Sequence, residues 1–365
     1  MKNTFGTSVT LTLFGESHGE LIGAVLDGLA PGIDIDDSFI KRQLSLRRPQ
    51  GGISTKRVEK DEYSIVSGIF NGKTTGAPVC IIISNKNVNS ADYEKTRFLA
   101  RPGHADYTAN IKYHGYEDHR GGGHFSGRLT APVVAAGAIL IPALKKLGIN
   151  IASHIKKCAG VNDRDFEDLS SDFEKLNDSV FPVLSDESAE SMRKEILKAA
   201  ENNDSVGGVL ETIVTGVPAG VGEPWFDSLE GVLSHALFGI PGIKGVEFGA
   251  GFRFADMKGS EANDPFYCEN GNIYTKTNNN GGINGGISNG MPLLFRCAVK
   301  PTPSIYKKQN TVDINTYENS VIEISGRHDP AIIHRARVVV DSVTALVLTD
   351  MLAMRFGTDF LGGKN

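Results

Sequence analysis

The sequence is poor in cysteine, and the few cysteines that it has are scattered. Its 365 residues include four, Cys80, Cys158, Cys268 and Cys297, and none of them belongs to a CxxC pair. Spacings of this kind indicate neither a zinc site nor a dense disulfide framework. We therefore expect free thiols in the reducing environment of the cytoplasm.

The chain also lacks an excess of basic residues. Its 38 Lys and Arg residues are outnumbered by 43 Asp and Glu residues, which gives a formal net charge of -5. A nucleic-acid-binding surface usually needs an overall or clustered basic excess, so we expect no nucleic-acid partner. An anionic small molecule stays compatible with this balance, provided that arginines converge locally.

Long apolar runs are missing as well. Residues 1–12 contain no apolar core of a signal peptide, and the most apolar stretch, residues 131–144, is shorter than a bilayer span. The expectation is a cytoplasmic protein that does not enter a membrane.

Glycine, in contrast, is abundant. The 42 glycines include clusters at residues 120–127, 216–224 and 278–290. No fixed period relates these clusters, so a repeat architecture is not indicated. Clustered glycine is typical of loops in which the backbone comes close to a ligand.

The hydrophobic patterns predict helices and strands that mix without a strict βαβ alternation. The expected elements are, in chain order, a strand at 9–14, a helix at 37–47 that begins after Asp36, strands within 65–85, loops over 88–128, a buried helix at 130–147, a strand at 210–215 and a helix at 226–239. The highly charged segment 162–204 is expected to be an exposed helical insertion. Residues 335–356 are predicted to form a long amphipathic helix with Asp341 and Asp350 facing solvent. This mixture favours an α+β fold over a doubly wound parallel sheet.

Residues 15–19, GESHG, match the GxSxG pattern of a serine-hydrolase nucleophile elbow, so acyl transfer by Ser17 is one hypothesis. The surroundings differ from those of an elbow, which follows several strands and leads directly into a helix. A second interpretation is a tight turn in which Ser17 and His18 have no chemical role. The third is that both residues belong to a larger active site assembled from other motifs.

A second histidine segment, RPGHADY at 101–107, places Arg101 and His104 on a loop that can direct both side chains toward a cleft. Further histidines and acids nearby could in principle bind a metal: His114, His119, His124, Asp106 and Asp118. Their spacing matches no zinc-binding pattern such as HExxH. We expect no metal, and we expect His114 and His119 to be ordinary surface or packing residues.

Arginines lie beside these glycine and histidine segments. The set comprises Arg47, Arg48, Arg101, Arg120, Arg128, Arg327, Arg335 and Arg337. A guanidinium group matches a carboxylate or a phosphate with paired hydrogen bonds. Loop arginines near histidines therefore indicate a ligand with several negative charges, while scattered surface charge accounts for some members of the set.

Seven unusual motifs follow one another from near the N-terminus to the last predicted helix. They are FGESHG…LDGLAPG at 14–32, RRPQG at 47–51, RPGHADYT at 101–108, RGGGHFSGR at 120–128, GGISNG at 285–290, KPTPSI at 300–305 and GRHDP at 326–330. Together they resemble the motifs of the chorismate synthase family.

The resemblance implies a lyase of the shikimate pathway and of aromatic amino acid biosynthesis. Its reaction converts 5-enolpyruvylshikimate 3-phosphate into chorismate and phosphate by a 1,4-elimination that requires reduced FMN without net consumption. The implied fold is a β-α-β-α sandwich that forms one domain over residues 1–365 and assembles as a homotetramer. No flavin-reductase domain is evident in the sequence, so we expect the monofunctional type, in which an external reductant reduces FMN. Use of NADPH (NADP) as the electron source stays open.

Chemistry and resemblance together suggest roles for three residues. Departure of phosphate needs a proton and a positive charge, which the imidazolium of His18 can supply. The resemblance assigns His104 to the reduced flavin, where a histidine can stabilise or protonate the ring near N1. It also places the carboxylate of Asp329 near flavin N5.

The motifs also imply binding residues. The flavin contacts are His124, Phe125, Ser126, Pro241, Gly242, Gly285, Lys300, Pro301, Thr302, Pro303, Ser304 and Arg327. The substrate contacts are Ser17, Arg47, Arg48, Arg101, Arg128 and Arg335. The chain departs from the commoner family pattern in two places: RGGGRSSAR becomes RGGGHFSGR, and Ile53 stands where an arginine is often found.

Overall fold

Short antiparallel strands in the first quarter of the chain build the first of two five-stranded sheets. The computed structural model describes residues 2–49, 52–54, 61–86, 97–324 and 328–362. The strands of this sheet lie in the order β1 (Thr4–Phe5), β2 (Thr10–Gly15), β3 (Leu21–Asp27), β7 (Val79–Ser84) and β4 (Tyr63–Ser67). Val79, Ile81 and Ile83 are buried and alternate along β7 with more exposed residues, so one face of the sheet is turned toward the core.

The second five-stranded sheet is also antiparallel, and both of its faces are covered. Its strands lie in the order β11 (Ile243–Phe248), β16 (Leu293–Val299), β10 (Gly208–Thr215), β8 (Asn150–Cys158) and β9 (Val161–Asn162). Along β10, Leu210 and Val214 belong to the main core, whereas Ile213 belongs to a second apolar cluster with Leu176. The strand therefore carries buried apolar side chains on both faces, although it also contains Glu211 and Thr212.

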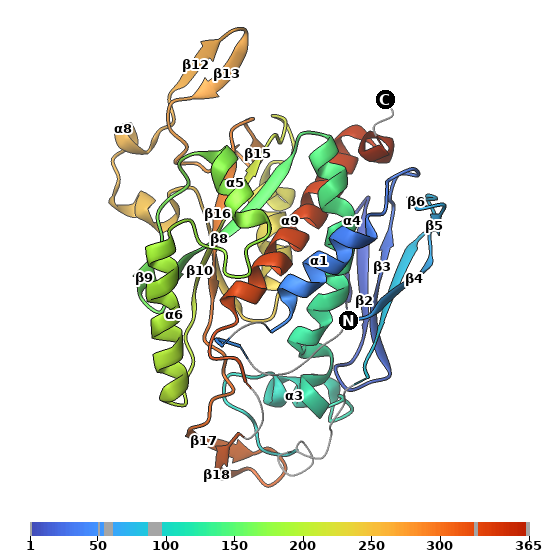
Figure 1. Cartoon of the computed structure of the whole chain (residues 1–365), viewed down its shortest axis with the longest axis vertical. Coiled ribbons are helices and arrows are strands. Elements are labelled where there is room, and N and C mark those ends of the chain that lie inside the picture. The colour runs from blue at the N-terminus through green and yellow to red at the C-terminus, as the bar shows by residue number, and fades with distance from the viewer. Residues whose placement is uncertain (1, 50–51, 55–60, 87–96, 325–327, 363–365) are drawn as a thin grey trace.

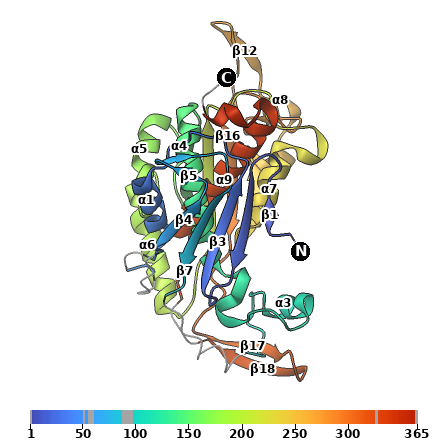
Figure 2. The same ribbon diagram turned by 90° about the vertical axis from the view of Figure 1, so that its right-hand side faces the viewer.

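Helices fill the space between the sheets and cover the outer face of the second sheet (Figures 1 and 2). The inner helices are α1 (Asp37–Arg47), α4 (Thr130–Lys146) and α9 (Ile333–Phe356), while α7 (Leu229–Phe238) packs on α9 and β11. On the outer side, α5 (Leu169–Asn177) contacts β8, and α6 (Asp186–Glu201) contacts β9. The layers therefore run sheet, helices, sheet, helices, which is the expected α+β fold of the β-α-β-α sandwich type.

Smaller elements extend from these layers. They are β5 (Ile69–Phe70), β6 (Lys73–Thr74), α3 (Asp106–Tyr113), the 3-10 turns at Arg120–Phe125, Gly127–Leu129, Trp225–Asp227, Gly251–Asp256 and Thr358–Gly362, α8 (Gly259–Ala262), and the hairpins β12–β13 (Phe266–Glu269 and Asn272–Thr275), β14–β15 (Ile283–Asn284 and Ile287–Ser288) and β17–β18 (Lys308–Asp313 and Glu318–Glu323). In Figure 1, β12–β13 and β17–β18 project from opposite ends of the molecule, and α3 lies near β17–β18.

The two long helices α4 and α9 approach each other closely at the centre. A Cβ atom at Gly137 of α4 would overlap Ser342 of α9, so only glycine allows this approach. The stretch Gly127–Lys146 is the one helix of the described chain that is long and apolar enough to cross a membrane. Because 72% of its most apolar window is buried inside the protein, the stretch has the surroundings of a core helix.

The predicted exposure of two aspartates is wrong. Asp341 and Asp350 are only 4% and 2% exposed, because α9 is covered on both sides by sheets and helices. The Asp341 carboxylate accepts a hydrogen bond from Ser153 and lies 3.2 Å from Arg337 Nη1. The Asp350 carboxylate accepts three hydrogen bonds from the backbone N–H groups of residues 7–9. Ser153 and residues 7–9 are far from these aspartates in the sequence, whereas Arg337 lies one turn earlier on α9. Both buried carboxylates therefore have hydrogen-bond partners.

The segment 162–204 is helical, as expected, and its helices α5 and α6 form the outer layer of the sandwich. It is not exposed throughout, because Met192 and Ile196 of α6 are fully buried. The region 88–128, where loops were expected to dominate, also contains the helix α3 in its described part.

Candidate active site

The GESHG segment is the turn between β2 and β3, and it packs against the glycine-rich segment 120–127. The backbone N–H of Ser17 donates to the carbonyl oxygen of Gly123 at 3.0 Å. On the other side of the turn, His124 Nδ1 lies 2.8 Å from the carbonyl oxygen of Gly15. Two motifs that are more than 100 residues apart in the sequence are therefore joined by hydrogen bonds at Gly15 and at Ser17.

Gly121 is what allows this close packing. Its φ of 60° lies in the left-handed region, and a Cβ atom there would overlap the imidazole ring of His18. Ser17 and His18 are both buried beneath this turn, at 7% and 8% exposure. The glycine-rich segment thus fixes where the His18 ring lies.

The same geometry bears on the hydrolase hypothesis for Ser17. A nucleophile elbow joins a strand to a helix, so that the serine stands at the helix start. Here Ser17 lies in a hairpin between the antiparallel strands β2 and β3, and no helix follows it. The segment has the GxSxG sequence but not the strand-to-helix turn that exposes the serine as a nucleophile.

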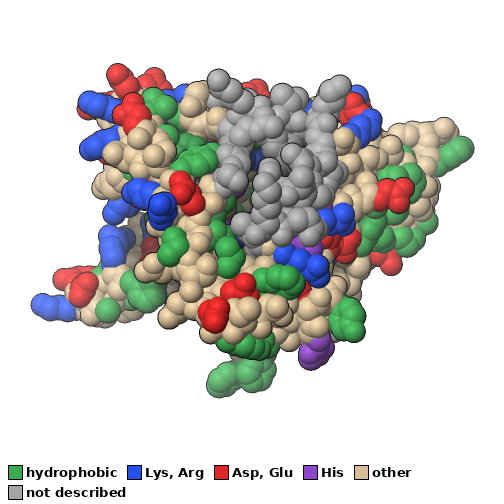
Figure 3. All heavy atoms as spheres, turned by 90° about the horizontal axis from the view of Figure 1, so that it is seen from below, with side chains coloured by type: hydrophobic (Ala, Val, Ile, Leu, Met, Phe, Trp, Pro, Cys, Tyr) green, Lys and Arg blue, Asp and Glu red, His purple; other side chains and the backbone are tan. Residues whose placement is uncertain are grey.

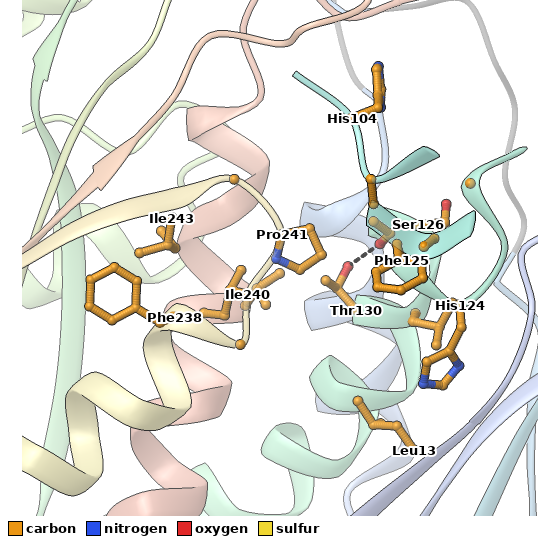
Figure 4. A pocket seen from close by; sticks show the side chains of 18 of the residues that line it. Leu13, His104, His124, Phe125, Ser126, Thr130, Phe238, Ile240, Pro241 and Ile243 are labelled. Carbon is orange, nitrogen blue, oxygen red and sulfur yellow. Dashed lines mark hydrogen bonds between the residues drawn. The ribbon is translucent and has the colours of Figure 1, made fainter. Parts of the chain in front are cut away.

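A cavity of about 850 Å³ opens beside the glycine-rich segment. It lies between the connection from α7 to β11 on one side and residues 101–130 on the other; Figure 4 shows Phe125 and Ser126 across from Pro241. Its walls contain most of the predicted flavin contacts, namely His124, Phe125, Ser126, Pro241, Gly242, Lys300, Pro301, Thr302 and Pro303, together with Arg101 and His104. The volume is within the range of small-molecule and cofactor sites.

His104 stands at this cavity next to the KPTPSI segment. Its Nε2 lies 2.7 Å from Ser304 Oγ, and Lys300 Nζ donates to the carbonyl oxygen of Gly103 at 2.5 Å. Burial, and next the positive charge of Arg101, lower the pKa of His104 to about 4. The imidazole is consequently neutral at pH 7, so one ring nitrogen carries an N–H that can donate and the other can only accept.

Arg101 is held in place by Asp106 at the start of α3. Its Nε and Nη2 atoms donate to the two carboxylate oxygens of Asp106, each at 2.7 Å, and its backbone N–H donates to the same group at 3.0 Å. This is the paired geometry that guanidinium and carboxylate groups favour. Arg101 thus enters the cavity wall in a fixed orientation.

Three other predicted substrate arginines meet around a residue that no motif contains, Asp61. Arg47 Nη2 lies 2.9 Å and Arg48 Nε lies 3.6 Å from Asp61 Oδ2, while Arg128 donates to Oδ1. Arg128 also reaches Asn85, at 3.3 Å. The arginines of the first helix and of the glycine-rich segment therefore converge on one carboxylate.

The last predicted arginine joins this cluster through the backbone. Arg335 Nε donates to the carbonyl oxygen of Arg47 at 2.7 Å, and its Nη1 donates to the Asp329 carboxylate. Asp329 is buried. The predicted carboxylate of the reaction and a predicted substrate arginine are thus direct partners.

Comparisons with known proteins agree on one family. The chorismate synthase family model matches residues 9–353, most of the chain. The chain belongs to the chorismate synthase family. It is 48% identical to the chorismate synthase of Thermococcus gammatolerans (strain DSM 15229 / JCM 11827 / EJ3), over 96% of this chain and 97% of that one.

A bacterial chorismate synthase, from Dehalococcoides mccartyi (strain ATCC BAA-2100 / JCM 16839 / KCTC 5957 / BAV1), is 46% identical over 98% of each chain. A crystal structure of a chorismate synthase superimposes with a TM-score of 0.75 at 29% identity, covering 97% of this chain and 94% of the other. These relationships establish an enzyme of the chorismate synthase family and its β-α-β-α sandwich. Membership of this family makes the protein a lyase of the shikimate pathway and implies a flavin cofactor.

Some residues that the chorismate synthase motifs imply lie outside this arrangement. Gly285 is in the turn of the β14–β15 hairpin and does not line the cavity. Arg327 lies outside the described residues. Ile53, at the position where the family often has arginine, is buried at 6% exposure and belongs to the main core.

The histidines behave differently from one another. His114 is exposed at the end of α3, as expected for a surface residue. His119, which was expected to have no special place, lines the cavity. No group of three or more potential metal ligands occurs among the residues that the structure describes.

Several residues of the chorismate synthase site carry no signal that a single sequence could reveal. Asp61 and Asn85 lie outside every motif, yet Asp61 holds the arginines, and Asn85 donates to the carbonyl oxygens of Glu16 and Gly19 at 3.0 Å. His235 and Lys2 also line the cavity. Their only common property is proximity in the fold.

Two arginines of the cluster around Asp61 are buried. The side chains of Arg47 and Arg128 are only 4% and 10% exposed. Figure 3 views the end of the molecule that carries α3 and β17–β18, and on this face Lys and Arg side chains are mixed with Asp and Glu among the described residues.

Proposed function

We propose that this enzyme converts 5-enolpyruvylshikimate 3-phosphate into chorismate and phosphate by 1,4-elimination, with reduced FMN as the flavin. The observation that carries the proposal is a cluster of four arginines, Arg47, Arg48, Arg128 and Arg335, next to a cavity whose wall contains Arg101 and His104. His18 packs beneath the glycine-rich turn that lines the cavity, and His104 lies in the cavity wall. An anionic substrate with one phosphate and two carboxylates needs a cationic site of this kind.

The cavity fits a flavin mononucleotide by volume and by chemistry. Apolar and aromatic walls such as Phe125 and Pro241 suit an isoalloxazine ring, and Lys300 supplies a cation nearby. The residues that would hold the flavin are those of segments 124–126, 241–242 and 300–304. When bound, the reduced flavin supplies an electron-rich ring that assists the elimination and is not consumed.

The substrate would be held by Ser17 and by the arginine cluster around residues 47, 48 and 128, with Arg101 and Arg335 at its sides. Guanidinium groups in fixed orientations bind and orient phosphate and carboxylate without moving at the moment of reaction. His18 would donate a proton to the departing phosphate oxygen. Exclusion of water from this buried region strengthens both interactions.

His104 and Asp329 would serve the flavin side of the reaction. A neutral His104, fixed by Ser304, can donate a hydrogen bond to a developing negative charge at flavin N1. The Asp329 carboxylate would accept or relay the proton that leaves the substrate ring, and its hydrogen bond from Arg335 holds it in a fixed orientation.

Anaerobic turnover tests the proposal. Protein supplied with 5-enolpyruvylshikimate 3-phosphate and dithionite-reduced FMN should release chorismate and phosphate in equal amounts, whereas oxidised FMN alone should give neither. The matched negative control is the same mixture without protein. Absence of chorismate under fully reducing conditions would disprove the proposed reaction.

We also propose that the protein is a cytoplasmic homotetramer that receives reduced flavin from an external source, with NADPH as one possible electron donor. Exposed aromatic side chains support assembly, since Trp225, Phe226 and Phe252 are each at least 86% exposed. Light scattering after size-exclusion chromatography should give four times the mass of the 39.2 kDa chain. A monomer mass at micromolar concentration would contradict this part of the proposal.

A further inference from the structure

Asp61 occupies an unusual place for an acidic residue. It lies directly among the arginines that the proposed function assigns to an anionic substrate, and its carboxylate has 0% exposure. A carboxylate in an anion site repels an anionic ligand, so its presence there needs an explanation. The residues that contact Asp61 supply one.

The carboxylate joins segments that are otherwise separate. Arg47 ends α1, Arg128 lies in the turn that leads into α4, and Asp61 precedes β4 at the edge of the first sheet. Arg47 Nη2 is 2.9 Å from one carboxylate oxygen, and Arg128 donates to the other. One carboxylate therefore fixes the distance between two guanidinium groups from different helices.

The same two arginines connect to the rest of the site. The carbonyl oxygen of Arg47 accepts from Arg335 at 2.7 Å, and Arg128 reaches Asn85, which in turn holds the GESHG turn through Glu16 and Gly19. A shift of Arg47 would therefore displace Arg335, and a shift of Arg128 would displace Asn85 and the GESHG turn.

The backbone and the ionisation of Asp61 fit a fixed counter-ion. Its φ of 46° lies in the left-handed region, which aspartate tolerates better than most residues. Burial by itself would raise the pKa of the carboxyl, but Arg47 and Arg128 outweigh burial and hold the pKa below its ordinary value. The group is consequently charged at pH 7.

We propose that Asp61 is a positioning residue for the reaction: its buried carboxylate holds Arg47 and Arg128 in the separation and orientation in which they bind the anionic groups of the substrate. It touches neither substrate nor flavin in this role. The inference rests on the proposed function, which makes these arginines substrate ligands. Its specific consequence is that loss of Asp61 weakens anion binding, although an anionic competitor has been removed.

Two variants of Asp61 distinguish its positioning of the arginines from the effect of its negative charge on the ligand. Asp61→Asn keeps the size of the side chain but removes the charge, and Asp61→Ala opens a space in which formate can stand in for the carboxylate. Asp172→Ala is the matched control, because Asp172 is also a buried aspartate paired with an arginine, Arg164, but on α5 at the outer layer. It should lower stability without changing the site.

The first measurement is calorimetric binding of inorganic phosphate, which needs neither flavin nor turnover. Asp61→Asn and Asp61→Ala should bind phosphate about 10-fold to 100-fold more weakly than the wild type, the effect seen when groups that orient metal ligands are removed. Formate should restore most of the affinity of Asp61→Ala and none of that of Asp172→Ala. In turnover, KM should rise by the same factor, with a smaller change in kcat.

The outcomes are distinct. Unchanged or tighter phosphate binding by folded Asp61→Asn would overturn the inference, since it would make Asp61 a bystander or a competitor of the ligand. A failure of both variants to fold, judged by near-ultraviolet circular dichroism, would also overturn it in favour of a purely structural role. If the wild type binds phosphate but makes no chorismate, the proposed function fails, while the phosphate comparison still decides what Asp61 does.

Discussion

His104 Nε2 lies 2.7 Å from Ser304 Oγ, although the two residues are 200 positions apart in the sequence. This contact brings the RPGHAD and KPTPSI motifs together at one wall of the cavity. It also fixes which ring nitrogen of His104 can face a ligand, because Nε2 is already engaged. The chemical behaviour of His104 therefore depends on a partner from another motif.

The first prediction concerns the ionisation of His104. Burial and Arg101 lower its pKa to about 4, so NMR titration of the protein without added flavin should show this imidazole neutral down to about pH 5. Binding of anionic reduced FMN should raise this pKa, because a negative charge favours the imidazolium form. An imidazole that titrates near pH 6.5 in the free protein would contradict the prediction.

The same shift has a consequence for stability. Since the folded pKa lies below the unfolded value, the unfolded chain binds more protons between pH 6.5 and about 4, and the stability that His104 contributes is lost as the pH falls through this window. His104→Gln should remove this pH dependence. Urea unfolding of both proteins at several pH values should show the difference between them shrinking toward low pH.

A second prediction tests the proposed acid, His18. His18→Ala should lower kcat by about 10²-fold to 10⁴-fold, the usual cost of losing an acid catalyst, and His104→Ala should cost a similar factor. His114→Ala is the control, because His114 is exposed at the end of α3 and should leave kcat unchanged. Full activity of either site variant would remove its histidine from the mechanism.

A third prediction concerns Gly121. Gly121→Ala should displace the His18 ring, because the added Cβ overlaps it and φ is positive, and kcat should fall by about 10²-fold, as expected when a catalytic group moves by about 1 Å. The control is Gly259→Ala, which should be neutral, because Gly259 does not line the cavity and no atom lies within 4 Å of its added Cβ. Equal activities would show that the turn does not set the position of His18.

Local features of the fold could be predicted from the sequence because their causes are local. The helix α1 begins where Asp36 caps it, accepting from the backbone N–H of Phe39 at 3.0 Å, and α4 spans the predicted apolar stretch. Most of the flavin contacts that the chorismate synthase motifs imply lie in the cavity wall. What joins the motifs to one another could not be predicted, since no pattern in a single sequence relates Asp61 to Arg128 or His104 to Ser304.

The error over α9 has the same origin. Asp341 and Asp350 are nine residues apart, so at about 3.6 residues per turn they point to opposite sides of α9 and cannot share one solvent-facing stripe. Ser153 and the backbone of Val9, which are far away in the sequence, supply hydrogen bonds that the sequence pattern does not reveal.

The last prediction follows from this burial. The Asp350 carboxylate accepts hydrogen bonds from the backbone N–H groups of Thr7, Ser8 and Val9 at 2.9, 2.7 and 2.8 Å, and so fastens the start of β2 to the central helix. Asp350→Asn keeps the shape of the side chain but replaces one accepting oxygen by an NH₂ group, which cannot accept from a backbone N–H. The free energy of unfolding should therefore fall by about 3 kcal/mol. Urea unfolding measures this loss.

The control for Asp350→Asn is Asp27→Asn, which removes an exposed carboxylate that accepts a hydrogen bond from its neighbour Gly28 and should change the free energy of unfolding by about 0.5 kcal/mol or less. A loss of similar size in both variants would mean that the N-terminal segment is held by β1 and β3 pairing alone. A large loss confined to Asp350→Asn would instead identify this buried carboxylate as the link between the first strands and the core.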